Sequence, residues 1–458
     1  MLKPDAARKA KIRTSEHGGN RLQVVSRPIV ELKLDRKNPR LHSKKQIHQI
    51  ACSIQAFGFN VPILIDRQDQ VVAGYGRALA AQKLGWHEIP TIRLEHLTDA
   101  QALAFRIADN RLTEISTWDE QLLGEQLKSL TEVKLEFSLE ATGFEMGEID
   151  LLIEGIKSQP DGKPDPADAL PDPGPSVSQP GDLWLLGPHR LFSGNALEEA
   201  SYRTLMEGKH AALVFTDPPY NVVIDGHTSG LGRIKHREFM MASGELSPAE
   251  FTAFLLKTCT LLKQYSDAGS VHFICIDWRH IGELLAAGRQ VYAELKNVYV
   301  WVKDAAGMGS LYRSQHEFVL VFKHGREAHR NNVELGKYGR SRTNVWHYPG
   351  VHSFARSSEE GNLLALHPTV KPVALVADAL LDCSGRGEIV LDAFVGSGTT
   401  FIAAERTGRV CCGMELDPIY VDTAIRRWQR WTGQQARHAT SGKLFDELET
   451  KRGEPHGN

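Results

Sequence analysis

The stretch Ala211-Ala-Leu-Val-Phe-Thr-Asp-Pro-Pro-Tyr220 decides the fold of this 458-residue chain. Its first five residues have the length and composition of a buried strand, and the two prolines end that strand. Ligands of open α/β sheets collect outside the carboxyl ends of the strands, so Asp217 predicts a binding site there. A carboxylate, the ring of Tyr220 and a free carbonyl would suit a planar molecule that carries an amino group. An ordinary turn, in which Asp and Pro are common, is the alternative.

A second signal lies nearer the carboxyl terminus. Residues 388–394 are typical of a strand, Gly396-Ser-Gly398 of a tight turn, and residues 399–406 of a helix. The next predicted strand, 409–416, carries Glu415 about twenty residues after the glycines, the offset at which nucleotide-binding units place a carboxylate on ribose hydroxyls. The glycines would let a ligand approach the backbone. Because no lysine follows them, the turn is not a phosphate loop.

Three segments resemble, in this order, the catalytic, cofactor-flanking and cofactor-binding motifs of the β group of DNA amino-methyltransferases. They are Asp217-Pro-Pro-Tyr220, His367-Pro-Thr-Val-Lys-Pro372 and Asp392-Ala-Phe-Val-Gly-Ser-Gly-Thr-Thr400. The resemblance runs from Gly181 to about Gly433. It implies an α/β fold with a Rossmann-like doubly wound sheet, S-adenosylmethionine as cofactor, and site-specific methylation of DNA. Protein and ribosomal RNA methyltransferases with a similar Pro-Pro-Tyr motif place the cofactor motif first, which argues against them.

The matched motifs supply the candidate site residues. The catalytic candidates are Asp217, Pro218, Pro219 and Tyr220, and the cofactor-binding candidates are Lys371, Asp392, Phe394, Gly396, Gly398, Thr399 and Glu415. The exocyclic amine of adenine delocalises its lone pair into the ring, so acceptors at Asp217 and at the Pro218 carbonyl would free that pair for attack. Tyr220 would stack on the flipped base. The mechanism needs neither a metal nor a covalent intermediate.

The amino-terminal half alternates short apolar strands with amphipathic helices, which predicts a small α+β domain over residues 20–157. The expected strands are 29–34, 63–66, 70–73 and 89–94, and the expected helices are 43–57, 75–84, 99–110 and 118–130. Segments 58–62, 74–80 and 108–111 resemble the three boxes of the ParB/sulfiredoxin-like domain, although the third box departs from the pattern. The resemblance implies a nucleotide site at Gly74, Arg77, Asn110 and Arg111. A strand-to-helix turn that needs glycine is the alternative.

Composition sets the remaining boundaries. The basic residues 1–19 predict a disordered tail, and the proline-rich residues 158–181 predict an extended linker between semi-independent halves. The methyltransferase domain is expected over 182–436, with 437–458 as a polar tail. Within it, residues 221–244 predict a loop that closes over the target base or touches DNA. Residues 326–356 mix basic and aromatic side chains, which predicts DNA contact at Arg340, Arg342 and Trp346, or else an ordinary surface excursion.

No signal peptide and no apolar run long enough to span a bilayer are evident, so we expect a cytoplasmic protein without a membrane partner. The six cysteines lack zinc-type spacing and are expected to be reduced. The expected partner is double-stranded DNA, and a homodimer is left open. The combination of a ParB-like domain with a DNA methyltransferase domain resembles the DNA-methylating proteins of prophages or restriction-modification systems.

Because cytosine-N4 enzymes more often begin the catalytic motif with Ser, Asp217 favours adenine N6 as the target. Two alternatives remain. One is a cytosine-N4 methyltransferase. The other is a ParB-like DNA-binding or nucleotide-switch protein whose methyltransferase half has decayed, against which the intact Tyr220, Gly396 and Glu415 count.

Overall fold

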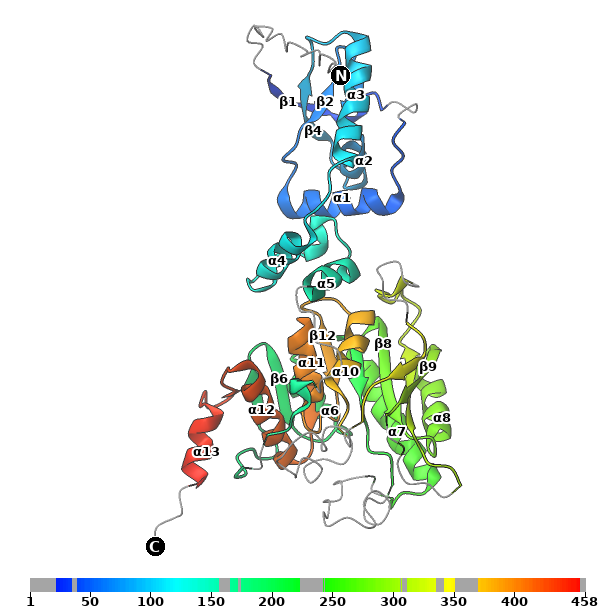
Figure 1. Cartoon of the computed structure of the whole chain (residues 1–458), viewed down its shortest axis with the longest axis vertical. Helices are drawn as coiled ribbons and strands as arrows, with labels where there is room; N and C mark the ends of the chain where they lie inside the picture. The colour runs from blue at the N-terminus through cyan, green and yellow to red at the C-terminus, as the bar shows by residue number, and fades with distance from the viewer. Residues whose placement is uncertain are drawn as a thin grey trace, which may run out of the picture. The chain divides into compact units, whose positions relative to one another are not determined.

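The computed structural model describes residues 22–34, 39–155, 165–171, 174–222, 242, 244–304, 306, 311–334, 342–350 and 370–453. The chain divides into two compact units, Met1–Glu145 and Met146–Asn458 (Figure 1). We call them the amino-terminal unit and the carboxy-terminal unit. The division falls ahead of the boundary expected at residue 157.

The amino-terminal unit is an α+β domain with a four-stranded sheet in the order β1-β4-β2-β3. Its strands are β1 Val24–Pro28, β2 Ile63–Ile65, β3 Val71–Ala73 and β4 Glu88–Arg93. Its α-helices are α1 Lys44–Phe57, α2 Tyr75–Lys83, α3 Asp99–Glu114 and α4 Glu120–Thr131, and its 3₁₀ helices are η1 Ile29–Glu31 and η2 Leu139–Thr142.

One predicted strand of this unit is wrong. The first strand ends at Pro28 and residues 29–31 form a 3₁₀ turn, after which Leu32 is extended and Lys33 makes an isolated bridge with Gln70. Ile29 and Leu32 are both buried, since residues three apart face the same side of such a turn. The apolar residues of this segment are therefore spaced for a turn that packs against the core.

The carboxy-terminal unit is built on a ten-stranded sheet in the order β11-β9-β10-β8-β7-β12-β13-β6-β5-β14. Its strands are β5 Leu183–Leu186, β6 His189–Ser193, β7 Ala211–Thr216, β8 Ser266–Ile276, β9 Glu294–Val302, β10 His316–Lys323, β11 Val345–His347, β12 Ile389–Asp392, β13 Val410–Glu415 and β14 Arg437–His438. Its helices are α5 Met146–Gly155, η3 Pro166–Asp168, α6 Glu199–Met206, α7 Pro248–Gln264, α8 Ile281–Val291, α10 Val373–Cys383, α11 Thr399–Thr407, α12 Pro418–Thr432 and α13 Phe445–Gly453.

The centre of this sheet is parallel, as a doubly wound α/β fold requires. Strands β8, β7, β12, β13 and β6 pair in parallel, whereas β10 runs antiparallel to β8. In the register of β7 and β12, Leu213 lies beside Val390 and Val214 beside Leu391. Because the two parallel strands end at the same height in the sheet, the residues that follow them lie at the same edge of the sheet.

Helices cover both faces of the sheet (Figure 1). Side chains of α10, α11 and α12 pack with Leu213 and Phe215 of β7 in one apolar cluster. Side chains of α6, α7 and α8 pack with Val214 in a second cluster on the other face. Successive side chains of β7 thus point to opposite faces of the sheet and enter two different apolar clusters. The fold is the predicted doubly wound α/β arrangement, with helices on both faces of the sheet.

The described part of the expected linker is docked on the carboxy-terminal unit instead of being free. Asp165 receives two hydrogen bonds from Arg406, at 2.7 and 2.8 Å. Ala167 and Val177 are 3% and 1% exposed, and the amide of Val177 donates to Asp422 at 2.7 Å. The prediction from proline content was wrong for residues 165–171 and 174–181, because a few buried side chains and carboxylates hold them in place.

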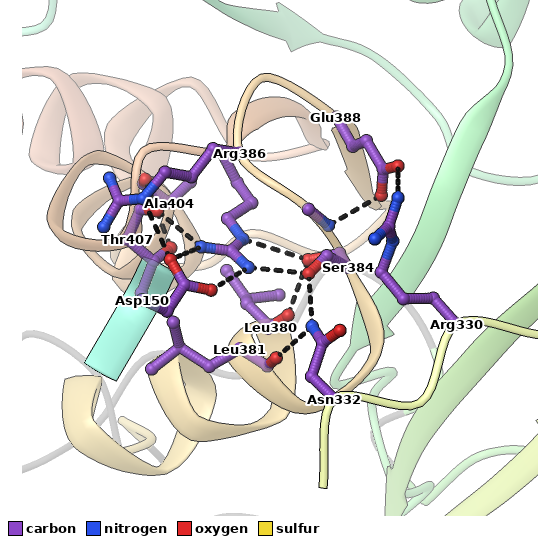
Figure 2. A network of polar contacts seen from close by, with 12 residues as sticks. Asp150, Arg330, Asn332, Leu380, Leu381, Ser384, Arg386, Glu388, Ala404 and Thr407 are labelled. Atoms are coloured by element: carbon purple, nitrogen blue, oxygen red, sulfur yellow. Dashed lines mark hydrogen bonds and ion pairs between the residues drawn. The ribbon is translucent and has the colours of Figure 1, made fainter. Parts of the chain in front are cut away.

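Helix α5 joins the same unit through a buried ion pair, shown in Figure 2. Arg409 donates to both oxygens of Asp150, at 3.1 and 2.8 Å, and both side chains are fully buried. Arg386 lies 2.9 Å from the same carboxylate. Arg409 also donates to the carbonyl oxygens of Thr407 and Ser384. The Asp150 carboxylate is therefore the counter-charge that both guanidinium groups share.

The expected polar tail also contributes to the fold. Strand β14 pairs with β5, and Phe445 at the start of α13 is fully buried against Trp184. The six cysteines, all among the described residues, are free thiols. None of the helices that the structure describes combines the length and apolar composition that crossing a membrane requires.

Candidate active site

The two sequence motifs meet at neighbouring strand ends. Thr216, the last residue of β7, donates its hydroxyl to Asp392 Oδ1 at 2.8 Å. The hydroxyl of Thr400 donates to Asp392 Oδ2 at 2.6 Å, and the amide of Phe394 donates to Oδ1 at 3.0 Å. Burial raises the pKa of Asp392 to about 6. Asp392 therefore joins the end of β7 to the glycine turn and holds that turn in shape.

Asp217 lies at the centre of a polar cluster. The hydroxyl of Tyr220 donates to Asp217 Oδ1 at 2.5 Å, and the ammonium of Lys371 donates to Oδ2. Lys371 Nζ also lies 3.1 Å from the Tyr220 hydroxyl and 5.4 Å from the centre of its ring. The motif match assigned Lys371 to the cofactor, whereas the structure places its ammonium on the Asp217 carboxylate.

Sequence reasoning missed three members of this cluster. Glu317, at the start of β10, is 8% exposed and lies 3.2 Å from Lys371 Nζ. Lys303 follows β9 and donates to Glu317, and its Nζ lies 4.7 Å from the ring centre of Trp301. Lys303 follows one apolar segment and Glu317 begins the next, so two opposite charges at consecutive strand ends were a signal that the sequence offered.

Burial and neighbouring charges set the protonation of the cluster. Burial raises the pKa of Asp217, an effect that Lys371 opposes and Glu317 adds to. Burial also favours protonation of Glu317, yet Lys371 and Lys303 outweigh it and lower the pKa of Glu317 to about 2. Burial lowers the pKa of Lys371, but the two carboxylates raise it above its ordinary value. The pKa of Tyr220 is raised by burial and by both carboxylates, so its hydroxyl keeps its proton at neutral pH.

Glu415 and the glycine turn form the adjoining part of the site. The amide of Gly396, whose φ is 53°, donates to one oxygen of Glu415 at 2.9 Å, and the amide of Asp417 donates to the other at 3.0 Å. Burial raises the pKa of Glu415 to about 7. Because β12 and β13 are adjacent and parallel, an acceptor for hydroxyl groups lies beside a glycine backbone, which fits a nucleoside ligand. Phe394 adds a partly buried aromatic ring.

Gly398 and Thr399 are occupied in shaping the turn. Gly398 has a φ of 86°, and a Cβ there would lie 2.8 Å from the Cβ of Ala424. Thr399 accepts a hydrogen bond from Arg427 at 3.0 Å and donates to the carbonyl of Lys371 at 3.3 Å. Both residues therefore fix the backbone conformation of the glycine turn. Within the described ranges, no three His, Cys, Asp or Glu side chains are grouped so as to hold a metal ion.

Two residues predicted to contact DNA, Arg342 and Trp346, instead contact side chains of the protein. Arg342 forms ion pairs with Asp378 at 2.6 Å and Asp382 at 3.0 Å on α10. Trp346 is 4% exposed and stacks on Tyr299, with ring centres 4.5 Å apart. The prediction of base stacking by Trp346 was wrong, because this ring belongs to the core. Arg340, and residues 223–241 and 243 of the predicted loop, lie outside the described residues.

The nucleotide candidates of the amino-terminal unit are only partly brought together. Gly74 opens α2 with a φ of 95°, and a Cβ there would lie 2.8 Å from a guanidinium nitrogen of Arg77. The Nε of Arg77 is buried and finds no hydrogen-bond partner among the described residues. Burial lowers the pKa of Arg77, and Asp109 opposes this. Asn110 is bonded to Arg40 at 3.0 Å, and the exposed Arg111 lies 3.6 Å from Glu114.

A family model for DNA methylases matches residues 211–426, the range that holds Asp217, Lys371, Gly396 and Glu415. Residues 211–426 belong to the N6/N4 DNA methylase family. The chain also matches a ParB N-terminal domain over residues 13–111 and a ParB-methyltransferase helix-turn-helix domain over 121–180. The first match confirms the ParB resemblance. Sequence reasoning missed the second, which covers α4, α5 and most of the expected linker.

Relatives match each half of the methylase. It is 42% identical over 81 residues to the ParB-like nuclease domain-containing protein YnaK of Escherichia coli K12, covering 18% of this chain and 93% of the relative. It is 27% identical over 253 residues to the type II methyltransferase M.HpaI of Haemophilus parainfluenzae, covering 52% of this chain and 73% of the relative. The crystal structure of an M1.HpyAVI–SAM complex aligns with 52% of this chain and 98% of its own, at 18% identity and a TM-score of 0.37.

Proposed function

We propose that this methylase transfers a methyl group from S-adenosylmethionine to the exocyclic N6 of an adenine flipped out of double-stranded DNA. One observation carries the proposal. The Asp217 cluster and the Gly396–Glu415 turn occupy adjacent strand ends, and the Thr216–Asp392 hydrogen bond joins them. A group that donates a methyl and a group that accepts it can therefore be held beside each other.

The residues around the glycine turn would hold the cofactor. Glu415 offers its carboxylate to the ribose hydroxyls, Gly396 offers a backbone without a side chain, and Phe394 offers a ring to the adenosine. Asp392, Gly398 and Thr399 keep the turn in shape. When bound, S-adenosylmethionine supplies an electrophilic methyl group.

Asp217 and its neighbours would prepare the target amine. A hydrogen bond from the amine to the Asp217 carboxylate, and a second to the Pro218 carbonyl, would draw the nitrogen toward a tetrahedral shape and free its lone pair. Asp217 would then take the proton that the nitrogen loses after methylation, and the raised pKa of Asp217 favours this uptake. Tyr220 offers its ring as the stacking surface for the flipped base. Most of the acceleration would come from positioning and from fixed charges.

Adenine is favoured over cytosine by the carboxylate at position 217. Methylation-aware sequencing of DNA from cells with and without the gene reports the modified base and its context. We expect N6-methyladenine at one short sequence. N4-methylcytosine at that position would reassign the target, and the absence of any mark would support a DNA-binding protein with an inactive methyltransferase half.

Asp217→Ala tests the assigned chemistry. The variant should lose methyl transfer by at least about 10²-fold while it still binds S-adenosylmethionine, because the carboxylate acts on the amine and not on the cofactor. Asp267→Ala, at an exposed position of β8, is the matched control and should transfer methyl normally. A mark that persists in Asp217→Ala would show that another group activates the amine.

The amino-terminal unit supports a second proposal, that Gly74 and Arg77 hold the phosphate of a nucleotide. The supporting observation is a buried guanidinium nitrogen without a described partner beside the amino-terminal end of α2, where backbone N–H groups favour anions. Calorimetric titration with each ribonucleoside triphosphate should show binding to the full chain that Arg77→Ala abolishes and Lys83→Ala retains. Equal binding by both variants would exclude this site.

A further inference from the structure

Both carboxylate oxygens of Asp217 are occupied in the structure. Oδ1 accepts the hydroxyl of Tyr220, and Oδ2 accepts the ammonium of Lys371. Each oxygen keeps a second lone pair, so an incoming amine can also donate to Asp217, but it then shares the carboxylate charge with Tyr220 and Lys371. A donor whose hydrogen bond to Asp217 weakens in this way needs another acceptor nearby, because an unpaired polar group in a buried place is destabilising.

Glu317 offers that acceptor to both donors. Its Oε2 lies 3.1 Å from the hydroxyl oxygen of Tyr220 and 3.2 Å from Lys371 Nζ. These are the distances at which hydrogen bonds form, so neither donor has to travel far to exchange partners. Lys371 thus lies between two carboxylates and can favour either of them.

Lys303 fixes Glu317 in this position. It donates to Glu317 Oε1, which leaves Oε2 facing Tyr220 and Lys371. The indole of Trp301 lies 4.7 Å from Lys303 Nζ and 5.8 Å from Lys371 Nζ, so one ring supports both cations. Two carboxylates and two ammonium groups balance one another, and the exchange of partners moves no net charge into or out of the cluster.

We propose that Glu317 is a positioning residue, which takes over the hydrogen bonds of Tyr220 and Lys371 while Asp217 holds the target amine. The inference rests on the proposed function and extends it to a residue outside the recognised motifs. During the reaction the amine nitrogen forms a bond to the methyl carbon as the carbon–sulfur bond breaks, with its electron pair going to sulfur. The proton leaves the nitrogen for Asp217, and Lys371 remains paired with Glu317 until that proton passes to water.

Glu317→Gln tests the proposal, because the amide keeps the size of the side chain and loses its charge. We expect kcat to fall on the order of 10²-fold, with KM for DNA and for S-adenosylmethionine unchanged within about twofold. The acidic limb of the kcat–pH profile should move to lower pH, since Glu317 no longer repels the charge on Asp217. Glu317→Asp keeps the charge and should keep the acidic limb near its original pH.

Glu294→Gln is the matched control. Glu294 lies at the opposite end of the neighbouring strand β9 and pairs with Lys296 at 3.2 Å on the surface. This variant should leave kcat and the pH profile unchanged. A loss of the same size in both variants would mean that the strand pair, and not the charge of Glu317, limits the rate.

A second measurement needs no turnover. In protein labelled with ¹³C at the aspartate carboxyl carbon, the Asp217 signal is assigned by its absence from Asp217→Asn. Its titration midpoint should lie at lower pH in Glu317→Gln than in the original chain. An unchanged midpoint, or a kcat within about twofold of the original, overturns the role of Glu317. If the original chain methylates no DNA, the proposed function fails, and the titration still decides whether Glu317 acts on Asp217.

Discussion

Glu415 shows how a single carboxylate can couple cofactor binding to pH. Its two oxygens accept the amides of Gly396 and Asp417, and burial raises its pKa to about 7. A glutamate held this way exchanges its proton with solvent in the range in which most enzymes are assayed, whereas an exposed one is ionised throughout it. Ribose hydroxyls donate hydrogen bonds and so favour the ionised form.

We therefore expect the affinity for S-adenosylmethionine to rise with pH. Below pH 7 the free protein holds a proton on Glu415 that binding must release, so affinity should fall roughly tenfold for each pH unit below this pKa. Titration calorimetry in two buffers of different ionisation enthalpy measures the proton released. Glu415→Gln should bind more weakly at neutral pH and release none. Equal affinity of the original chain at acidic and alkaline pH would contradict the assignment of Glu415 to the ribose.

Helix α10 begins at Val373, two residues after Lys371, and its first amide donates its hydrogen bond to a residue outside the helix. Pro372 at the N-cap position has no side-chain hydrogen bond to offer, and the amide of Val373 donates instead to Asp168 Oδ1 at 2.7 Å. Arg427 links the same segment to the glycine turn, because it donates to the Ala167 carbonyl at 2.9 Å and to Thr399 at 3.0 Å. The segment around η3 thus supports both halves of the active site.

Asp168→Ala should leave the Val373 amide without its acceptor and cost about 1 kcal/mol of stability. Because Lys371 precedes this helix, we also expect a several-fold lower kcat. Asp168→Asn keeps an acceptor oxygen and should behave like the original chain in both thermal unfolding and methyl transfer. If the asparagine variant loses as much as the alanine variant, the charge of Asp168 matters more than its hydrogen bond to α10.

At the scale of the whole molecule, the buried charge of Asp150 attaches α5 to the carboxy-terminal unit. Asp150 forms ion pairs with Arg409 and with Arg386, and its removal would leave guanidinium groups uncompensated in the core. Figure 2 shows Asp150 beside Arg386. The Asp150 carboxylate therefore holds α5 on the carboxy-terminal unit. This helix lies within the range of the helix-turn-helix match.

Asp150→Ala should destabilise the carboxy-terminal unit by about 3–5 kcal/mol, the usual cost of breaking one partner out of a buried ion pair. Limited proteolysis should then cleave near α5 faster than it does in the original chain. Glu388→Ala removes a partly exposed ion pair with Arg330, at 3.0 Å, and serves as the control with a much smaller effect. Unchanged proteolysis of Asp150→Ala would mean that apolar packing alone holds α5.

The sequence predicted the strand ends that carry Asp217 and Gly396, since short apolar runs that stop at prolines or glycines specify local structure. It also predicted that Tyr220 and Gly396 belong to one site, because both follow parallel strands of one sheet. Glu317 was missed because its partners, Lys371 and Tyr220, lie far from it in the chain. Trp346 was misassigned for a related reason, because composition cannot tell an aromatic ring in the core from one on the surface.

Strands β7 and β12 are neighbours in space, although Thr216 and Asp392 are 176 residues apart in the chain. Backbone pairing in the sheet and the Thr216–Asp392 hydrogen bond, rather than a connecting loop, align their ends. The geometry of this edge of the sheet therefore does not depend on the order in which its two parts are translated. A gene rearranged so that the glycine segment came first could still assemble the same atoms around the same substrate.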